Sequence, residues 1–585
     1  MKIFLGILVF FLAFGWLVLL LAATGLFYFG AIVLSILASF VLAWLFLPKI
    51  SQNIDFKTGK IFGLVALLSL VISLAACHFA TPTVFGGRDQ GSIGTAAIYL
   101  SQGHNSKVNL PVAHDLFQKY GPGKALNFPG FDYAKDGSLF SRFPLGFTSY
   151  LAASYNLFGL KGIQYANFVP LFFFLILNWL IIKEFFDDKV SLLGYLLAAT
   201  FFPFLWFAKY ALTETYTLFL VWAGIYFLLR FQSQNQGRTL GKSQGSTLVW
   251  FSLAAFALSA LVRIEGIVFF FLAAIYILLL QRKKILDLPK NFKRNLVIAT
   301  LVLLALYFFL NFPDLIDSGK NLVKAFLPNS AKESAPSANM YEYLARIFFN
   351  YNLLAYILIG LVGIILLAKN IRKNWLKTEF LPLFLTFPTF IYLLSPMITL
   401  DEPWFLRRFV FAVFPALLLY SIYALQKFFY HKMFLYFVLV VLIVANGVVS
   451  WRFFTTSENK ELLPQIEKIS QKFGSDDLIL VDRMATGSGF SLASEPLQTI
   501  YGKQAVYFMN ADDLKFINQD RYKNIYLLTP LISEEQNPWY ADLVTDKSPA
   551  DAQIITNNFL EPADNKYALA QNVETKDLMV VWKVK

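Results

Sequence analysis

With 585 residues, of which 57% are hydrophobic and 15% charged, the chain is not a soluble domain, because soluble domains carry about 25% charged residues. The formal net charge of +13 fits a membrane protein with basic cytoplasmic loops. Nucleic-acid binding is not indicated, since no soluble segment shows a basic patch interleaved with aromatic residues. The single cysteine, Cys77, excludes an internal disulfide.

Apolar stretches of about 20 residues, the length that crosses a bilayer core, recur along the chain. They predict a polytopic α-helical membrane protein of about thirteen spans. The expected spans are 3–23, 27–47, 61–80, 162–182, 190–208, 212–230, 247–262, 264–281, 295–312, 346–368, 380–397, 407–426 and 432–451. Lys and Arg favour alternate connections between the spans by roughly twenty to four, which places the N-terminus in the cytoplasm. We expect the protein to lie in the plasma (inner) membrane. The long polar segment at 81–160, which interrupts the apolar spans, and the C-terminal tail, 454–585, are then both extracytoplasmic.

The break at residues 81–160 opens with the run Gly86-Gly87-Arg88-Asp89-Gln90-Gly91. Glycines on both sides of the charged pair allow a tight turn and a close approach of the backbone to a ligand. Beside a membrane, Asp89 could serve as a general base or as a metal ligand. A structural alternative is that Asp89 caps the helix expected in GSIGTAAIYL.

The tail has the composition of a soluble domain. We expect a helix at 459–473 and strands at 478–481, 505–509 and 523–530, with a last strand in DLMVVWKV at the end of the chain. Strands that alternate with helical pieces predict a small α/β domain. The chain therefore divides into a transmembrane part, 1–453, and an extracytoplasmic domain, 454–585.

Charged residues from distant parts of the sequence are expected at one level, the outer membrane surface. They are Arg88, Asp89, Glu214, Arg263, Glu265, Asp401, Glu402, Arg407 and Arg408. Ionisable groups at this depth line a site or pair with one another. The alternative to a site is structural pairing, for instance of Glu265 with Arg263 or of Asp401 with Arg407.

Arg407 and Arg408 begin an expected span that runs inward from the outer surface. Free amides, the positive end of the helix dipole and two guanidinium groups would then converge on one place. This arrangement suits a phosphate, which Arg can bind through two hydrogen bonds. An interfacial Arg pair can also be a simple membrane anchor, and Pro415 is expected to kink the helix.

The segments SRFPLGFTSYLAASYNLFG and RRFVFAVFPALLL, with the acidic turn at Asp89, resemble the GT-C class of integral membrane glycosyltransferases. The nearer branch is that of the protein mannosyltransferases and lipid A aminoarabinose transferases. Two features depart from the pattern: the usual Asp-Glu pair reads Asp89-Gln90, and two additional helices precede the loop. The missing carboxylate weakens the case for a metal, although a divalent cation stays open.

The resemblance implies transfer of a sugar from a polyprenyl-phosphate donor to a hydroxyl of a lipid, glycan or protein acceptor, with inversion. Asp89 would be the base, and Arg407 or Arg408, with Arg263, would bind the donor phosphate. The remaining candidates for substrate contacts are Arg88, Gln90, Arg142, Glu214, Glu265, Asp401 and Glu402. The competing hypothesis is a transporter or lipid flippase, for which midplane charges and inverted repeats would be expected.

Overall fold

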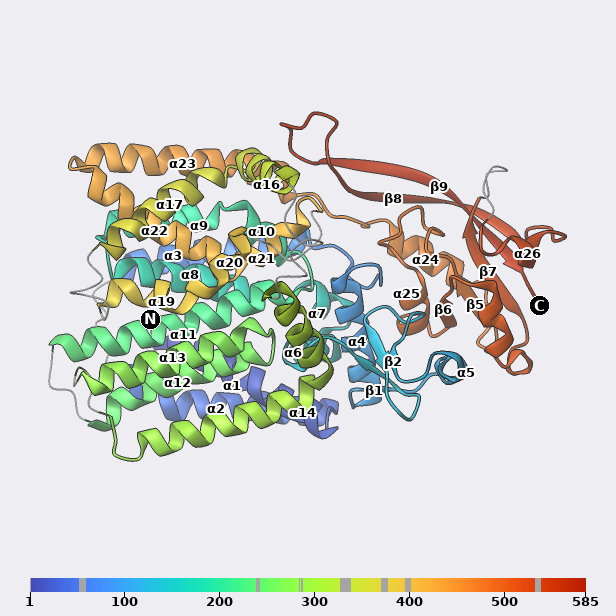
Figure 1. Ribbon diagram of the computed structural model, residues 1–585, viewed down its shortest axis with the longest axis horizontal. Coiled ribbons are helices and arrows are strands. Elements are labelled where there is room, and N and C mark those ends of the chain that lie inside the picture. The colour runs from blue at the N-terminus through green and yellow to red at the C-terminus, as the bar shows by residue number, and fades with distance from the viewer. Residues whose placement is uncertain are drawn as a thin grey trace.

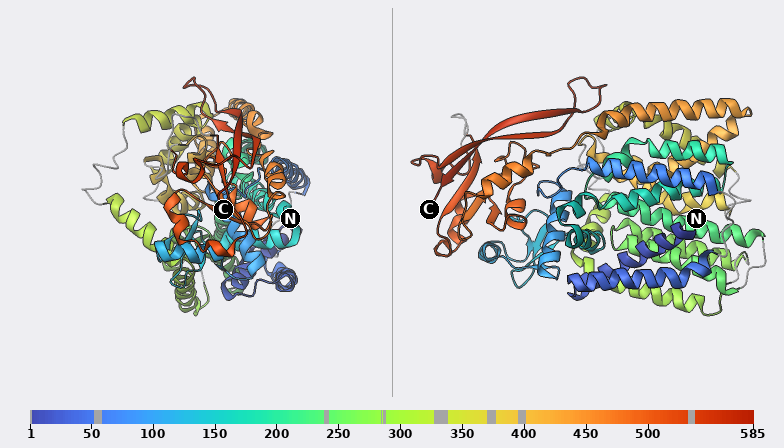
Figure 2. Two further views of the ribbon diagram at one scale, coloured as in Figure 1. Left: turned by 90° about the vertical axis from the view of Figure 1, so that its right-hand side faces the viewer. Right: turned by 180° about the vertical axis from the view of Figure 1, so that it is seen from behind.

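The computed structural model describes residues 2–51, 59–237, 242–283, 285, 288–326, 338–369, 377–394, 401–531 and 538–585. Long helices run side by side in a bundle, and two smaller regions that contain sheets lie beyond one end of it (Figure 1). The same separation is seen from behind (Figure 2, right).

The bundle is built from helices that match the apolar stretches of the sequence. They are α1 (Lys2–Thr24), α2 (Phe29–Ser51), α3 (Gly59–His78), α7 (Leu160–Gln164), α8 (Phe168–Lys183), α9 (Asp188–Ala199), α10 (Phe202–Ala208), α11 (Thr213–Gly237), α12 (Lys242–Ala260), α13 (Glu265–Arg282), α14 (Phe292–Phe326), α16 (Ala338–Asn350), α17 (Leu354–Ala368), η1 (Thr378–Phe380), α19 (Leu381–Thr386), η2 (Phe387–Phe390), α20 (Ile391–Leu394), η3 (Trp404–Leu406), α21 (Arg407–Val410), α22 (Val413–Phe428) and α23 (Lys432–Phe454).

Each of the predicted spans overlaps one of these helices or a group of consecutive ones. Within the described residues, seven helices are long and apolar enough to cross a membrane, or up to ten if each bent pair is one span, and shorter apolar helices lie at Thr247–Ala260 and Thr378–Leu394. The end of the span expected at 380–397 lies outside the described residues. The polytopic helical class is confirmed, and the count of about thirteen stays a prediction.

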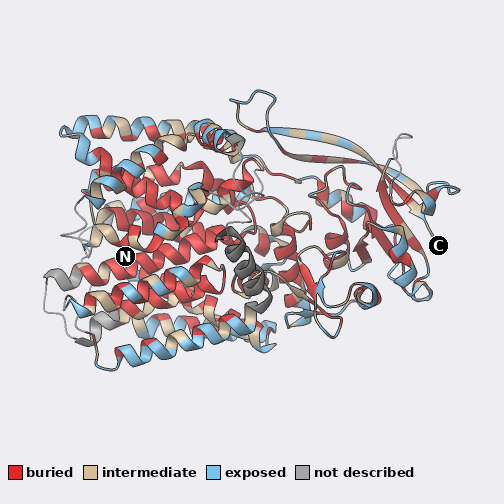
Figure 3. Ribbon diagram, in the orientation of Figure 1, coloured by how far each residue is buried: buried red, intermediate tan, exposed pale blue. Residues whose placement is uncertain are grey.

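Buried residues lie in the interior of the bundle, and exposed apolar residues lie on the surface that would face lipid. The helices at the centre are almost wholly buried, whereas α2, α14 and α23 at the periphery expose much of their surface (Figure 3). The exposed side chains on these helices are large and apolar, such as Phe40, Trp44, Leu301 and Phe437. Apolar side chains facing outward are stable next to hydrocarbon but not next to water.

The loop 81–160 folds into a compact unit at the end of the bundle. Its elements are α4 (Asp89–Gly103), β1 (Lys107–Val108), α5 (Pro111–Tyr120), β2 (Gly123–Lys124), β3 (Phe131–Tyr133), β4 (Leu139–Ser141) and α6 (Leu145–Phe158). The short strands form an antiparallel sheet in the order β1-β4-β3-β2, which the sequence analysis missed. The expected helix in GSIGTAAIYL is confirmed as α4, and the segment LGFTSYLAASYNLF forms α6.

The tail forms the expected α/β domain. Its elements are α24 (Leu462–Ser470), β5 (Leu478–Val481), α25 (Ser494–Thr499), β6 (Gln504–Tyr507), η4 (Ala511–Phe516), η5 (Gln519–Arg521), β7 (Ile525–Pro530), α26 (Ala541–Val544), β8 (Asp551–Glu561) and β9 (Gln571–Lys583). The sheet order is β6-β5-β7-β9-β8, parallel between β6, β5 and β7 and antiparallel at β9 and β8. The four predicted strands are confirmed, while β8 and the full length of β9 were missed.

The loop and the tail pack on each other through a common hydrophobic core. Val112, Leu116 and Tyr133 from the loop belong to the same buried cluster as Leu480 and Phe508 from the tail. An ion pair also joins the tail to the loop: the Arg521 guanidinium lies 3.1 Å from the Asp115 carboxylate. The two regions therefore form one body over this end of the bundle.

Candidate active site

The turn at the start of the loop brings Arg88 and Asp89 to the end of the bundle. Arg88 has extended backbone at φ −121° and ψ 166°, and α4 begins at Asp89 with no capping bond from the Arg88 side chain. The Arg88 carbonyl accepts hydrogen bonds from the amides of Gly91 and Ser92. Gly91 has no room for a side chain, because a Cβ there would lie 1.5 Å from the Phe85 carbonyl oxygen.

Two ion pairs join this turn to the segment that precedes α22. Arg407 Nη1 bonds to Asp89 Oδ2, and Arg88 Nη1 lies 2.5 Å from Asp401 Oδ2. The alternative in which Asp401 pairs with Arg407 is therefore wrong, and Asp89 makes a specific contact with a guanidinium rather than only starting a helix. The Asp89 side chain is 42% exposed, so it is accessible to a substrate.

A second charged cluster lies on the neighbouring helices and is more deeply buried. Arg263, between α12 and α13, bonds to Glu214 Oε1 at 2.7 Å and to Glu265 Oε1 at 3.0 Å. Glu265 also accepts from the Tyr392 hydroxyl at 2.7 Å, and Arg408 Nη1 lies 3.5 Å away. The structural alternative, in which Glu265 pairs with Arg263, is what the structure shows. The contact of Arg263 with a donor phosphate stays a prediction.

The helix expected at 407–426 is not a single helix. Arg407 and Arg408 lie in the four-residue α21, and the segments Trp404–Val410 and Val413–Phe428 are bent by 62°. The predicted kink at Pro415 is wrong in position, because this residue lies in the first turn of α22, where a missing N–H disturbs no helical hydrogen bond. The Arg pair therefore does not lie at the start of a long straight helix, and a phosphate here would be attracted by the two guanidinium groups rather than by a long helix dipole.

A cavity of about 590 Å³ opens between the turn, the loop sheet and the tail. Its lining includes Arg88, Asp89, Lys124, Asp132, Arg142 and Tyr507. Apolar surface comes from Phe131, Phe143 and Met509. A concave surface with a few convergent polar groups and apolar walls is typical of a small-molecule site.

The other predicted contact residues divide between the cavity and the interior. Arg142 lines the cavity and lies 3.3 Å from Asp132. Gln90 and Glu402 are buried, 8% and 4% exposed, and neither is among the described residues that line the cavity. Burial raises the pKa of Glu402. Their expected contacts with a substrate gain no support from this geometry.

The donor set around Asp89 does not fit a divalent metal ion. Among the described residues, no group of three or more His, Cys, Asp or Glu side chains could hold a metal. The carboxylate faces Arg407, and a cation would have to compete with that guanidinium.

Several residues of the site were missed from the sequence. Asp132 and Tyr507 line the cavity, and Tyr392 bonds to Glu265. Asp132 lies in the short strand β3, two positions after Gly130 and in the same loop as Asp89, which was a usable signal. Tyr507 comes from the tail and Tyr392 from an apolar stretch, and nothing local in the sequence indicates either position.

The fold is similar to that of a solved membrane glycosyltransferase. ArnT from Cupriavidus metallidurans, bound to undecaprenyl phosphate, is 11% identical and has a TM-score of 0.50, covering 90% of this chain and 98% of its own. The oligosaccharyltransferase AglB from Archaeoglobus fulgidus is 13% identical at a TM-score of 0.45, covering 81% of this chain and 70% of its own. No family model matches the sequence, and no curated protein is similar enough to match.

The likeness to ArnT, a GT-C glycosyltransferase, shows that the two chains share a fold, as the resemblance in the sequence predicted. This confirms the fold class expected from the sequence, namely a polytopic helical part followed by a C-terminal sheet domain.

Proposed function

We propose that the protein is an inverting glycosyltransferase that moves a sugar from a polyprenyl-phosphate donor to an acceptor hydroxyl at the extracytoplasmic membrane surface. The observation that carries this proposal is the pairing of an accessible carboxylate, Asp89, with the Arg407 guanidinium at the edge of a large cavity. The fold supports it, since the similar ArnT structure holds undecaprenyl phosphate.

In the proposed reaction, Asp89 accepts the proton of the acceptor hydroxyl as the oxygen attacks the anomeric carbon. The bond between that carbon and the phosphate oxygen breaks on the opposite face, and the lipid phosphate leaves as an anion. Arg407 binds this anion, so its guanidinium exchanges the Asp89 carboxylate for the donor phosphate. Donor binding would thus release the base for proton transfer, and the leaving group requires no general acid.

The cavity beside Asp89 is assigned to the sugar and the acceptor, which is a lipid, a glycan or a protein. Arg142, Lys124 and Asp132 offer charged groups for hydroxyls, and Phe143 and Tyr507 offer flat apolar surface. The N-terminus is assigned to the cytoplasm, and the loop and tail to the extracytoplasmic side of a plasma (inner) membrane, from the distribution of Lys and Arg.

The proposal is tested by following label from a panel of radiolabelled polyprenyl-phosphate sugars in membranes that contain the protein and cell-envelope acceptors. Transfer of label to a product that lacks the polyprenyl phosphate is expected. Movement of intact labelled donor across the membrane without sugar transfer would contradict the proposal and favour a flippase.

Replacing Arg407 with Ala is expected to raise the KM for the donor by about 10- to 100-fold, because a hydrogen bond to a charged group contributes about 1.5–3 kcal/mol. Arg408→Ala is the comparison, since that guanidinium faces Glu265 at 3.5 Å and a smaller effect on KM is expected. Initial rates at varied donor concentration measure both. A larger rise for Arg408→Ala would assign the phosphate to Arg408 instead.

A further inference from the structure

The tail contacts the turn that carries Asp89 at its two glycines. The Gly86 backbone lies against the Glu495 carboxyl group, because a Cβ on Gly86 would lie 2.2 Å from Glu495 Oε1. A Cβ on Gly87 would lie 2.3 Å from the Phe490 backbone. The Phe490 ring also faces the Arg88 guanidinium, with 4.3 Å from Cζ to the ring centroid. The tail therefore touches three consecutive residues before Asp89.

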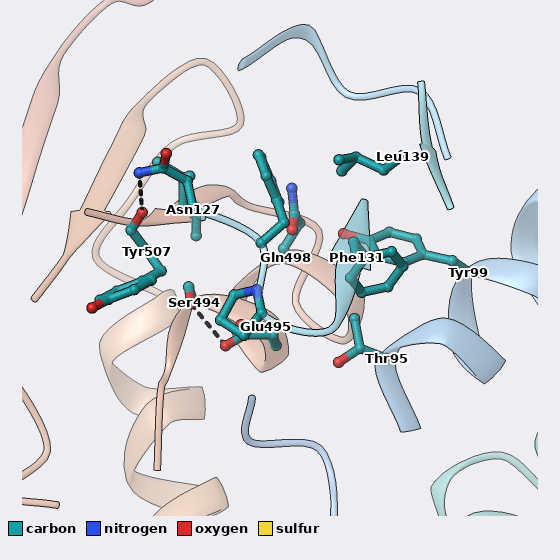
Figure 4. A pocket seen from close by; sticks show the side chains of 13 residues that line it. Thr95, Tyr99, Asn127, Phe131, Leu139, Ser494, Glu495, Gln498 and Tyr507 are labelled. Atoms are coloured by element: carbon teal, nitrogen blue, oxygen red, sulfur yellow. Dashed lines mark hydrogen bonds between the residues drawn. The ribbon is translucent and has the colours of Figure 1, made fainter. Parts of the chain in front are cut away.

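Glu495 is buried at the base of this contact. It lies in α25, which packs against α4, and its side chain accepts a hydrogen bond from Ser494 Oγ at 2.7 Å (Figure 4). Thr95 and Tyr99 of α4 and Gln498 of α25 line the same small cavity (Figure 4). The titratable groups that face Glu495 are the phenols of Tyr99 and Tyr507, whose pKa values it raises further above those set by burial.

We propose that Glu495 is a positioning residue, through which the C-terminal domain holds the Gly86–Asp89 turn in the geometry that the reaction needs. Burying a carboxyl group costs free energy unless it is hydrogen-bonded, and the buried Glu495 holds its carboxyl group against the Gly86 backbone of this turn. Asp89 follows Gly86 by three positions, so a displaced turn moves the base relative to Arg407. This inference rests on the proposed glycosyl transfer and gives the tail a part in it.

The contact is expected to weaken as pH rises. Burial raises the pKa of Glu495 to about 7 from an ordinary 4.5. When the contact opens, the carboxyl group regains its ordinary pKa and loses its proton more readily. Between these two values the closed contact should therefore weaken by roughly tenfold for each pH unit, and it is fully formed below pH 4.5.

The test compares Glu495→Gln, which keeps an acceptor oxygen and has no charge, with Glu495→Ala. We expect Glu495→Ala to lower kcat by about tenfold or more with little change in the KM for the donor, because a misplaced catalytic group slows the chemical step. Glu495→Gln should keep most of the activity. Glu461→Gln, at an exposed position of the same domain, is the control.

A second measurement does not depend on activity. Hydrogen exchange at the amides of residues 84–92 is expected to accelerate in wild type as pH rises from 5 to 8, beyond the intrinsic pH effect. It should be fast at all pH values in Glu495→Ala, and should lose this excess pH dependence in Glu495→Gln. Normal kcat in Glu495→Ala, or unchanged exchange in it, would overturn the inference. If wild type transfers no sugar, the exchange result still decides whether the contact exists.

The steric part of the contact gives an independent check. Gly86→Ala alone is expected to slow transfer, because its Cβ would overlap the Glu495 carboxylate. Adding Glu495→Ala removes the overlapping atoms. The transfer rate of the double variant should therefore fall by less than the product of the two single fold-decreases. If the fold-decreases in transfer rate simply multiply in the double variant, Gly86 and Glu495 do not act through each other.

Discussion

Asp89→Asn is expected to reduce sugar transfer by about 10²- to 10⁴-fold, the contribution typical of a general base. The amide keeps the shape of the side chain and cannot accept the proton of the acceptor. Arg407 would lose its ionic partner in the donor-free protein and stay available to the phosphate, so the KM for the donor should not rise. Initial rates at varied concentrations of labelled donor, at equal amounts of membrane protein, measure kcat and the KM for the donor.

The matched control is Asp136→Asn, in the same loop. Asp136 pairs with Lys107 at the surface, with 56% of its side chain exposed, and it does not line the cavity beside Asp89. Its rate should equal that of wild type. Equal rates in wild type and Asp89→Asn would remove Asp89 from the proposed mechanism and direct the search to Glu214 or Asp401.

The sequence predicted the fold class because membrane insertion imposes strong local constraints. Apolar length marks a helix wherever a segment lies in lipid, as in α1, α3 and α23. Breaks inside spans escaped this reasoning. The bend before α22 falls between Val410 and Val413, and Pro415, the expected signal, lies beyond it.

The sequence predicted the candidate site as one set of charged residues at the outer membrane surface. In the structure these residues form two separate clusters. Asp89 and Arg407 meet at an accessible cavity, whereas Arg263, Glu214 and Glu265 are paired in the interior. Partner choice across several hundred residues depends on how the helices pack, and no local pattern encodes it. The parts taken from the tail, Tyr507 and Glu495, could not be assigned before the docking of the tail on the loop was known.

Arg263→Met is expected to destabilise the protein by about 3–5 kcal/mol, the effect of removing one partner from a buried ion pair. The Arg263 and Glu265 side chains are 10% exposed and that of Glu214 is 2% exposed. Without the guanidinium, two carboxylates would face each other in a poorly hydrated site, and Arg408 at 3.5 Å from Glu265 would compensate only in part.

Thermal unfolding of the purified protein in detergent, followed by tryptophan fluorescence, measures this loss. Arg263→Lys keeps the charge and loses the forked geometry, so a smaller decrease in Tm is expected. Combining Arg263→Met with Glu214→Gln and Glu265→Gln removes all three charges and should recover much of the stability, because neutral replacement of a buried cluster is often tolerated. If the triple variant is no more stable than Arg263→Met, the cluster is not held by its charges. The loss would then have to come from the packing of the Arg263 guanidinium over the Phe411 ring, 4.7 Å from its centroid.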